Sequence, residues 1–177
     1  MGYEWREDRF ISPQLRWNVH PNWTLMPTYK EGRKSVLSDF LIGRNYKMQY
    51  RDATLQSLWR VQKVWTLTLS PEYVEKRVQI GESAVIKRCL GKVQYQSPQR
   101  TMWQGEWGFH DIRYSGTDKG SLQYDLLEGL RTGRNYTWSV QWQTMTGKLQ
   151  WSLLYNGRKS GKDTPIHTGM IQVKAVF

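Results

Sequence analysis

Large apolar residues alternate with polar ones through residues 135–157, NYTWSVQWQTMTGKLQWSLLYNG. Side chains on a strand alternate between its two faces, so a period of two indicates β-strands. The run predicts two strands joined at Gly147, because glycine readily adopts the positive φ of a tight turn. With MIQVKAVF at 170–177, these strands predict a C-terminal meander. The apolar positions of the first two strands are Tyr136, Trp138, Val140 and Trp142, then Leu149, Trp151, Leu153 and Tyr155.

Two earlier stretches show strand patterns as well. Residues 55–69, LQSLWRVQKVWTLTL, alternate well, with most of their polar residues on one face, and predict a half-buried strand or a pair of strands. Residues 92–114 have strand composition. Within them, Trp103 and Trp107 flank Gln-Gly-Glu, which predicts a hairpin with the two indoles facing each other.

Three segments carry helix signals. Residues 70–72 (Ser-Pro-Glu) supply an N-cap, a first-turn proline and an acid near the positive end of the helix dipole. They predict one helix or two short ones that end at Gly91. A helical turn is expected over 35–40, stopped by Gly43, and a short helix over 122–130. The expected fold class is therefore α+β, a mostly antiparallel sheet whose C-terminal meander packs against one to three short helices.

The aromatic ladder of the meander has competing explanations. Large aromatics bury the most area, so Trp138, Trp142 and Trp151 are expected to form the core between the sheet and the helices. One alternative is an exposed platform on which single-stranded bases stack. The other alternative is a protein interface.

Residues 1–30 mix three tryptophans with three prolines and show little periodicity. Proline disfavours helix in the residue before it, whereas disordered segments are poor in aromatics. We therefore expect an extended aromatic arm over 1–30 that packs on its own domain or on a neighbouring copy, followed by a single domain over 31–177. The residues expected to mediate self-association are Trp5, Trp17 and Trp23.

Composition adds a strong positive charge. The 177 residues include 26 Lys and Arg against 15 Asp and Glu, which gives a net charge of +11. Such a surface attracts polyanions: nucleic acid, acidic lipid headgroups or an acidic protein. Cys89 is the one cysteine, and no Cys/His spacing predicts a zinc site. No apolar run approaches the ~20 residues of a membrane-spanning helix. We expect an intracellular, non-secreted protein with no metal or cofactor.

Two segments are poor in acids, and their cations are the candidates for polyanion binding. After Glu128 the one acid is Asp163, and none lies between Glu82 and Glu106. Contacts of Lys and Arg with phosphates release counterions, so binding should weaken steeply with salt. The candidates are Arg131, Arg134, Lys148, Arg158, Lys159 and Lys162 in the first segment, and Lys87, Arg88 and Lys92 in the second.

No motif in the chain specifies a reaction. GRKSGKD at 157–163 is one residue short of a phosphate-binding loop, and Asp163 stands where that loop needs Ser or Thr. His110 and Asp111 come nearest to a base with an orienting acid, but adjacent strand residues point to opposite faces. We therefore expect no enzyme and no catalytic residues.

The order of elements resembles a known family. LWRVQKVWTLTL, the helix start at 70–72, YTWSVQWQ and LQWSLLYNG follow one another as in rhabdovirus matrix proteins, particularly the short ones of plant-infecting members. The resemblance covers about residues 55–177, and the chain has no PPxY late-domain motif. It implies a protein of the host cytoplasm or virion interior that condenses ribonucleoprotein, self-associates and contacts the inner membrane leaflet.

These observations give a leading hypothesis and two rivals. The first is a non-enzymatic, viral matrix-like protein that self-associates and bridges the nucleocapsid or its RNA to an acidic membrane surface as a peripheral protein. The alternative is an RNA-binding module such as a viral silencing suppressor. The third is an enzyme whose residues are scattered in sequence.

Overall fold

The computed structural model describes residues 3–39, 45–79, 81–98, 100–116 and 121–175. These residues form ten β-strands and one short helix, and all the strands belong to one sheet. The elements are β1 (Glu4–Ile11), β2 (Trp17–His20), β3 (Trp23–Ser38), β4 (Tyr46–Val61), β5 (Trp65–Val78), β6 (Ser83–Gln96), β7 (Met102–Ser115), α1 (Ser121–Leu126), β8 (Gly133–Thr146), β9 (Leu149–Ser160) and β10 (Ile166–Ala175).

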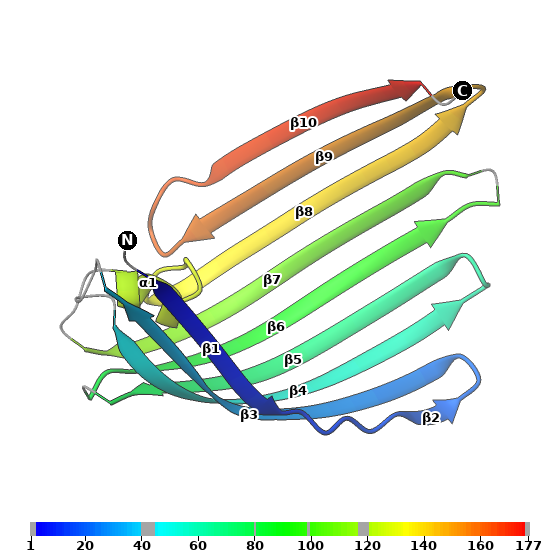
Figure 1. The fold of residues 1–177 in the computed structure, drawn as a ribbon. Helices are drawn as coiled ribbons and strands as arrows, with labels where there is room; N and C mark the ends of the chain where they lie inside the picture. Colours follow the sequence, from blue (N-terminus) through cyan, green and yellow to red (C-terminus); the bar gives the residue numbers. More distant parts are fainter. Residues whose placement is uncertain (1–2, 40–44, 80, 99, 117–120, 176–177) are drawn as a thin grey trace.

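The sheet is an antiparallel meander in which each strand from β3 to β9 pairs with the next along the chain. At the first edge, β1 pairs with the second half of β3 and β2 pairs with its start, so the segment expected to be an arm lies along this sheet. The sheet curves into an open trough with β10 at the opposite edge and α1 at one end (Figure 1).

The expected α+β class is wrong, since α1 is the one helix among the described residues. Residues 70–72 lie in the middle of β5 instead of starting a helix. Pairing with β4 and β6 on both sides of β5 overrides the local capping signal. The β4–β5 ladder is interrupted at Pro71, which has no N–H to donate.

Two smaller expectations are also wrong. Residues 35–38 continue β3 instead of forming a helical turn, and Gly43 lies outside the described residues. Trp103 and Trp107 lie on the continuous strand β7 instead of facing each other across a hairpin. In both places, hydrogen bonding to the strands on either side keeps the segment extended: β1 and β4 flank residues 35–38, and β6 and β8 flank residues 103–107.

Other elements are confirmed. The C-terminal meander is present as β8, β9 and β10, with Gly147 at positive φ in its first turn. Residues 55–69 form a pair of strands, the end of β4 and the start of β5. The turn between them places Gln62 and Lys63 at positive φ. The helix expected over 122–130 is confirmed in part by the shorter α1.

The hydrophobic core lies at one end of the trough, beneath α1. Leu122, Leu126 and Leu127 pack there against strands of the sheet. The sheet residues of this core are Met48, Tyr50, Val74, Val78, Ala84, Ile86 and Ile112. We call the face of the sheet that carries these residues and α1 the inner face, and the opposite face the outer face.

Candidate functional site

The outer face carries rows of apolar side chains that run across the strands. Paired residues on neighbouring strands share a face, and the register places Trp65, Tyr95, Trp103 and Trp142 in one row. The ring centroids of Trp65 and Tyr95 are 4.7 Å apart, and those of Trp103 and Trp142 are 6.0 Å apart. Neighbouring rows hold Trp23, Leu25, Leu55, Trp59, Leu67, Leu69, Val93, Trp107, Phe109, Tyr136, Trp138, Val140, Tyr155, Ile171 and Val173.

These rows stay largely open. Trp103 and Trp107 are each 48% exposed, and no helix of the described residues packs on their face. The expectation that Trp138, Trp142 and Trp151 form a core between sheet and helices is therefore wrong, because α1 packs on the inner face. An apolar patch of this extent marks a surface that meets another apolar phase or partner.

Directly behind the outer rows, the inner face is polar. Thr68 and Ser70 alternate with Leu67 and Leu69 along β5, so hydroxyl groups lie on one face and leucines on the other. The same arrangement continues across most of the sheet, and the apolar residues on this part of the inner face include Leu58, Leu90, Leu154, Ile166 and Met170. Its polar inner positions include Gln56, Thr66, Gln94, Gln104, Thr137, Ser139, Gln141, Gln143, Ser152 and Asn156.

The polarity of the two faces reverses along the long strands. In β5, the outer positions of residues 65–73 are apolar, whereas Glu75 and Arg77 follow on the same face. At that point the inner face becomes apolar, with Val74 and Val78 in the core under α1. In β4 the outer face reverses in the same row as in β5, between Ala53 and Arg51. In β6 and β7 it reverses one row nearer to Trp65, because Lys87 and Asp111 lie in the row of Tyr73. The sheet therefore has an ordinary globular half beneath α1 and a half with inverted polarity.

We call this second half the inverted half. It comprises residues 23–29 of β3, 53–61 of β4, 65–73 of β5, 89–95 of β6, 103–109 of β7, 136–142 of β8, 149–155 of β9 and 167–175 of β10.

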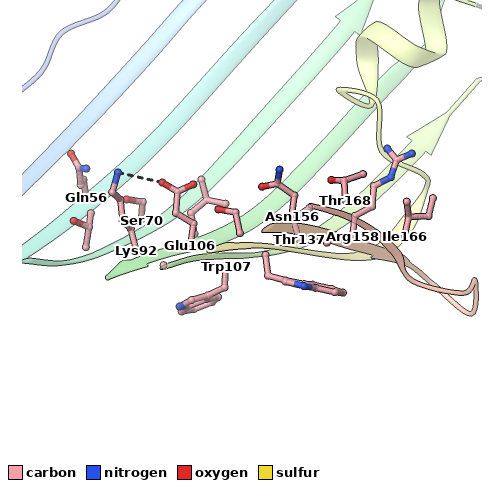
Figure 2. Close-up of a pocket in the computed structure, with 16 residues that line it drawn as sticks. Gln56, Ser70, Lys92, Glu106, Trp107, Thr137, Asn156, Arg158, Ile166 and Thr168 are labelled. Carbon is pink, nitrogen blue, oxygen red and sulfur yellow. Dashed lines mark ion pairs between the residues drawn. The ribbon is translucent and has the colours of Figure 1, made fainter. Parts of the chain in front are cut away.

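The polar inner face forms an open groove of about 700 Å³ (Figure 2). Lys92 and Glu106 form an ion pair in it with an N–O distance of 3.3 Å. Asn156 and Arg158 line the groove from β9. Figure 2 shows these polar side chains on one side of the sheet and Trp107 on the other. The groove offers hydrogen-bonding groups and charges to water or polar solutes.

An ion-pair network fixes the segment after α1 to the sheet. Lys76 Nζ lies 2.8 Å from the Glu128 carboxylate and donates a hydrogen bond to the Leu126 carbonyl at 3.2 Å. Arg88 pairs with both Glu128 and Glu72. Burial alone would raise the pKa of the Glu128 carboxyl, but Lys76 and Arg88 hold it below its usual value.

Asp125 attaches α1 itself to two strands. Its carboxylate accepts hydrogen bonds from Lys34 Nζ, at 3.1 Å, and from the Tyr46 hydroxyl. Burial would raise the pKa of the Asp125 carboxyl, but these hydrogen bonds and the charges of Lys34 and Lys76 lower it. The helix is thus held by apolar packing and by carboxylates that must be ionised.

Several of the nine predicted polyanion-binding residues are already neutralised. Arg88 belongs to the network beside α1, and Lys92 pairs with Glu106 in the groove. Arg131 pairs with Asp163. These contacts reduce the charge that the three cations can offer to a ligand.

The structure brings three other predicted cations together. Lys87, Arg134 and Lys159 are exposed on the outer face of β6, β8 and β9, where the apolar rows end. None of the ion pairs among the described residues includes any of these three. The remaining candidates are separate: Arg158 is on the inner face, and Lys148 and Lys162 lie in turns at opposite ends of β9.

The three tryptophans predicted to mediate self-association lie in different surroundings. Trp5 and Trp17 are 59% and 60% exposed on β1 and β2. Trp23 stacks on Trp59 with ring centroids 6.1 Å apart and donates a hydrogen bond to Ser57 Oγ at 2.9 Å. Trp23 therefore belongs to the apolar rows, whereas Trp5 and Trp17 lie along the edge strands.

His110 and Asp111 face opposite sides of β7. His110 lies on the inner face, with Nε2 3.2 Å from Thr137 Oγ1, whereas Asp111 is on the outer face with Lys87 and Arg134 as register partners. Over the residues that the structure describes, no three His, Cys, Asp or Glu side chains are grouped to hold a metal ion.

Sequence reasoning kept an exposed aromatic surface as an alternative to a core, but it did not identify the apolar outer face of the whole sheet, although the signal is present. WTLTLSPEY at 65–73 places apolar residues at every second position with Thr, Ser and Glu between them. The same alternation recurs at 103–109 and 136–142. The predicted helices would have covered this face, and without them the alternation describes a sheet that is apolar outside and polar inside.

Comparison of the chain with protein-family models, with curated proteins and with solved structures found no match. Among the described residues, no helix is long and apolar enough to cross a membrane. What remains as a guide to function is the distribution of apolar, polar and charged groups on the two faces.

Proposed function

We propose that the inverted half of the sheet is embedded in a lipid bilayer, with its outer face against the acyl chains. Its polar inner face then lines a water-filled space. The observation that carries the proposal is the reversal of polarity along the strands, since a sheet within lipid is apolar outside and polar inside. The half beneath α1 lies in water, because its outer face carries the ion pairs of Arg51 and Arg77 and the apolar core of its inner face is covered by α1.

The length of the apolar stretches supports a bilayer as the apolar phase. In β5 the outer positions are apolar over the nine residues from 65 to 73. A tilted strand needs ~9–11 residues to cross the hydrocarbon core. The apolar stretches of the other strands of the inverted half span seven to nine residues, which is close to this length.

Aromatic residues at the ends of these stretches fit the same environment. Trp65 and Tyr73 bound the apolar positions of β5, with leucines between them, and Tyr136 and Trp142 bound those of β8. Trp and Tyr concentrate where acyl chains meet headgroups, because their rings are apolar and their N–H or O–H group is polar.

The proposal also requires that the two edges of the sheet have hydrogen-bonding partners. Unpaired backbone N–H and C=O groups are costly in hydrocarbon, so open sheet edges do not occur there. In the structure, β10 and the β1–β2 side are the two edges. Further strands must therefore pair with both edges in the membrane.

The groove on the inner face gives the embedded sheet a role. Its hydroxyl, amide and ionic groups, including the Lys92–Glu106 pair, can hydrate and guide polar solutes. The proposed function is therefore a membrane-embedded wall of a polar compartment or passage, not a catalyst.

Quenching of tryptophan fluorescence by brominated lipid tests the proposal. The chain is folded into phosphatidylcholine vesicles that carry bromine on the acyl chains, and plain phosphatidylcholine vesicles are the control. Strong quenching is expected, because Trp65, Trp103, Trp107, Trp138 and Trp142 would lie against the chains. Protein that stays in the aqueous phase with unquenched fluorescence would contradict the proposal.

The earlier hypotheses stay predictions. A matrix-like role with nucleoprotein or RNA as partner, the RNA-binding alternative, the absence of enzymatic activity and the intracellular location are not needed for the proposed function. Self-association through Trp5, Trp17 or Trp23 would be one way to supply strands to the first edge.

A further inference from the structure

On the outer face, the charged residues where the apolar rows end differ between strands β3–β5 and strands β6–β9. On β3 to β5 the outer face carries two cations paired with acids, Arg51 with Glu31 at 3.0 Å and Arg77 with Glu75 at 2.5 Å. Arg33 and Lys47 lie farther from the apolar rows on the same face, and neither has an ion-pair partner among the described residues. On β6 to β9 the outer face carries four exposed cations and one acid. These residues are Lys87, Arg113, Arg134 and Lys159, with Asp111 among them.

The register makes these cations a compact cluster. Lys87 and Arg134 are the partners of Asp111 on its two sides, so they lie two strand spacings apart, roughly 10 Å. Lys159 is the partner of Tyr136, which is the outer residue next to Arg134 along β8. One acid cannot neutralise all of these charges.

Aromatic rings lie immediately beside the cluster. Phe109 and Tyr136 pack with centroids 5.4 Å apart, and they are the outer residues next to Asp111 and Arg134 in β7 and β8. A molecule that binds here meets cations and apolar rings on one continuous face. A lipid with a phosphate headgroup has this combination, whereas nucleic acid brings no acyl chain to the apolar rows.

We propose that Lys87, Arg134 and Lys159 bind the phosphate of anionic lipid headgroups while the acyl chains of the same lipids lie against the apolar rows of the outer face. This site rests on the proposed function, because it assumes that the rows are in the bilayer. The proposal adds to that function a preference of the β6–β9 part of the sheet for anionic lipids. Cations near an anionic membrane surface strengthen association by roughly fivefold each.

Competition between two brominated lipids measures this preference. The chain is folded into phosphatidylcholine bilayers that contain a small fraction of either brominated phosphatidylglycerol or brominated phosphatidylcholine. Tryptophan quenching by the two then gives a relative association constant. We expect a preference for phosphatidylglycerol in the unaltered chain that falls by roughly fivefold for each cation removed among K87Q, R134Q and K159Q.

The neighbouring residue provides a matched control. Arg158 and Lys159 are adjacent on β9, but Arg158 is on the inner face. Lys159→Gln should lower the preference and Arg158→Gln should leave it unchanged. Equal effects of the two changes, or an unaltered preference in the triple variant, would overturn the proposal.

Two further outcomes separate the possible errors. If inorganic phosphate removes the preference and chloride at equal ionic strength does not, the site binds free phosphate and the lipid assignment is overturned. If both brominated lipids quench equally, the inference fails and the proposed function stands. If neither quenches, the sheet is not in the bilayer and both fail.

Discussion

The indole of Trp107 lies across Gly91 of the neighbouring strand, where a Cβ added to the glycine would be 2.0 Å from Cε2. Trp138 and Gly157 repeat the arrangement, with a separation of 2.1 Å. In both pairs the missing side chain makes room for a ring against the backbone. Two tryptophans of the outer face are thus held in place although part of each remains exposed.

A methyl group in this space should therefore destabilise the sheet. We expect Gly91→Ala to lower the free energy of unfolding by about 1–3 kcal/mol, because overpacking forces the indole or the strand to move. Gly105→Ala is the control, since no atom of the described residues lies within 4 Å of the position that a Cβ of Gly105 would take. Urea unfolding in detergent micelles measures both variants, and equal losses would show that the Trp107 contact is not the cause.

An added arginine should distinguish the two faces of β5. Leu67 lies on the outer face and Thr68 on the inner face of the inverted half. Leu67→Arg should cost about 2–4 kcal/mol in a bilayer, the cost of a cation facing lipid near the midplane. Thr68→Arg should cost much less, because water and polar groups surround it. Unfolding titrations in vesicles test this, and a larger loss for Thr68→Arg would exclude the proposed orientation.

The attachment of α1 should depend on Lys76. Lys76 is 8% exposed, and its ammonium is bound by Glu128 and by the carbonyl of Leu126. Lys76→Met should lower the free energy of unfolding by about 2–4 kcal/mol, because a buried ionic partner is lost. The exposed Lys47 of β4 provides the control, and Lys47→Met should change the value by less than about 0.5 kcal/mol. Similar losses in the two variants would argue against the network.

Acid should release the α1 segment. The pKa values of Asp125 and Glu128 are lowered in the folded protein, so their ionised forms stabilise the attachment at pH above the usual carboxyl pKa of about 4. This stabilisation is lost as the pH falls from about 4 through the lowered pKa values. Hydrogen exchange of the amides in α1 should accelerate over that interval, and a rate that only follows the intrinsic chemistry would refute the mechanism.

Much of the sheet was predictable, because its signal is local. In β8 and β9, alternation and Gly147 agree with the pairing that forms, so the hairpin follows from the sequence. At residues 70–72 the local signal and the structure disagree. Their capping signal is equally local, but β5 is decided by β4 and β6, which pair with it over most of their length.

The functional surface was less predictable for a different physical reason. Alternation shows that Trp138 and Trp142 share a face, but it does not show what covers that face. The chain provides one short helix among its described residues, and this helix packs on the opposite face. Likewise, the sequence marked nine cations, whereas the register places Lys87, Arg134 and Lys159 as neighbours. Within the part of the chain that the structure describes, these three have no ion-pair partner, unlike Arg88, Lys92 and Arg131.

The most direct test compares two adjacent positions in a bilayer. In a Cys89→Ser background, a nitroxide is attached to the cysteine of Leu67→Cys or of Thr68→Cys, and its collisions with oxygen and with a water-soluble nickel chelate are measured. The proposed orientation predicts that the label at 67 collides mainly with lipid-dissolved oxygen and the label at 68 mainly with the nickel chelate. Equal access of the nickel chelate to both labels would contradict a lipid-facing outer surface.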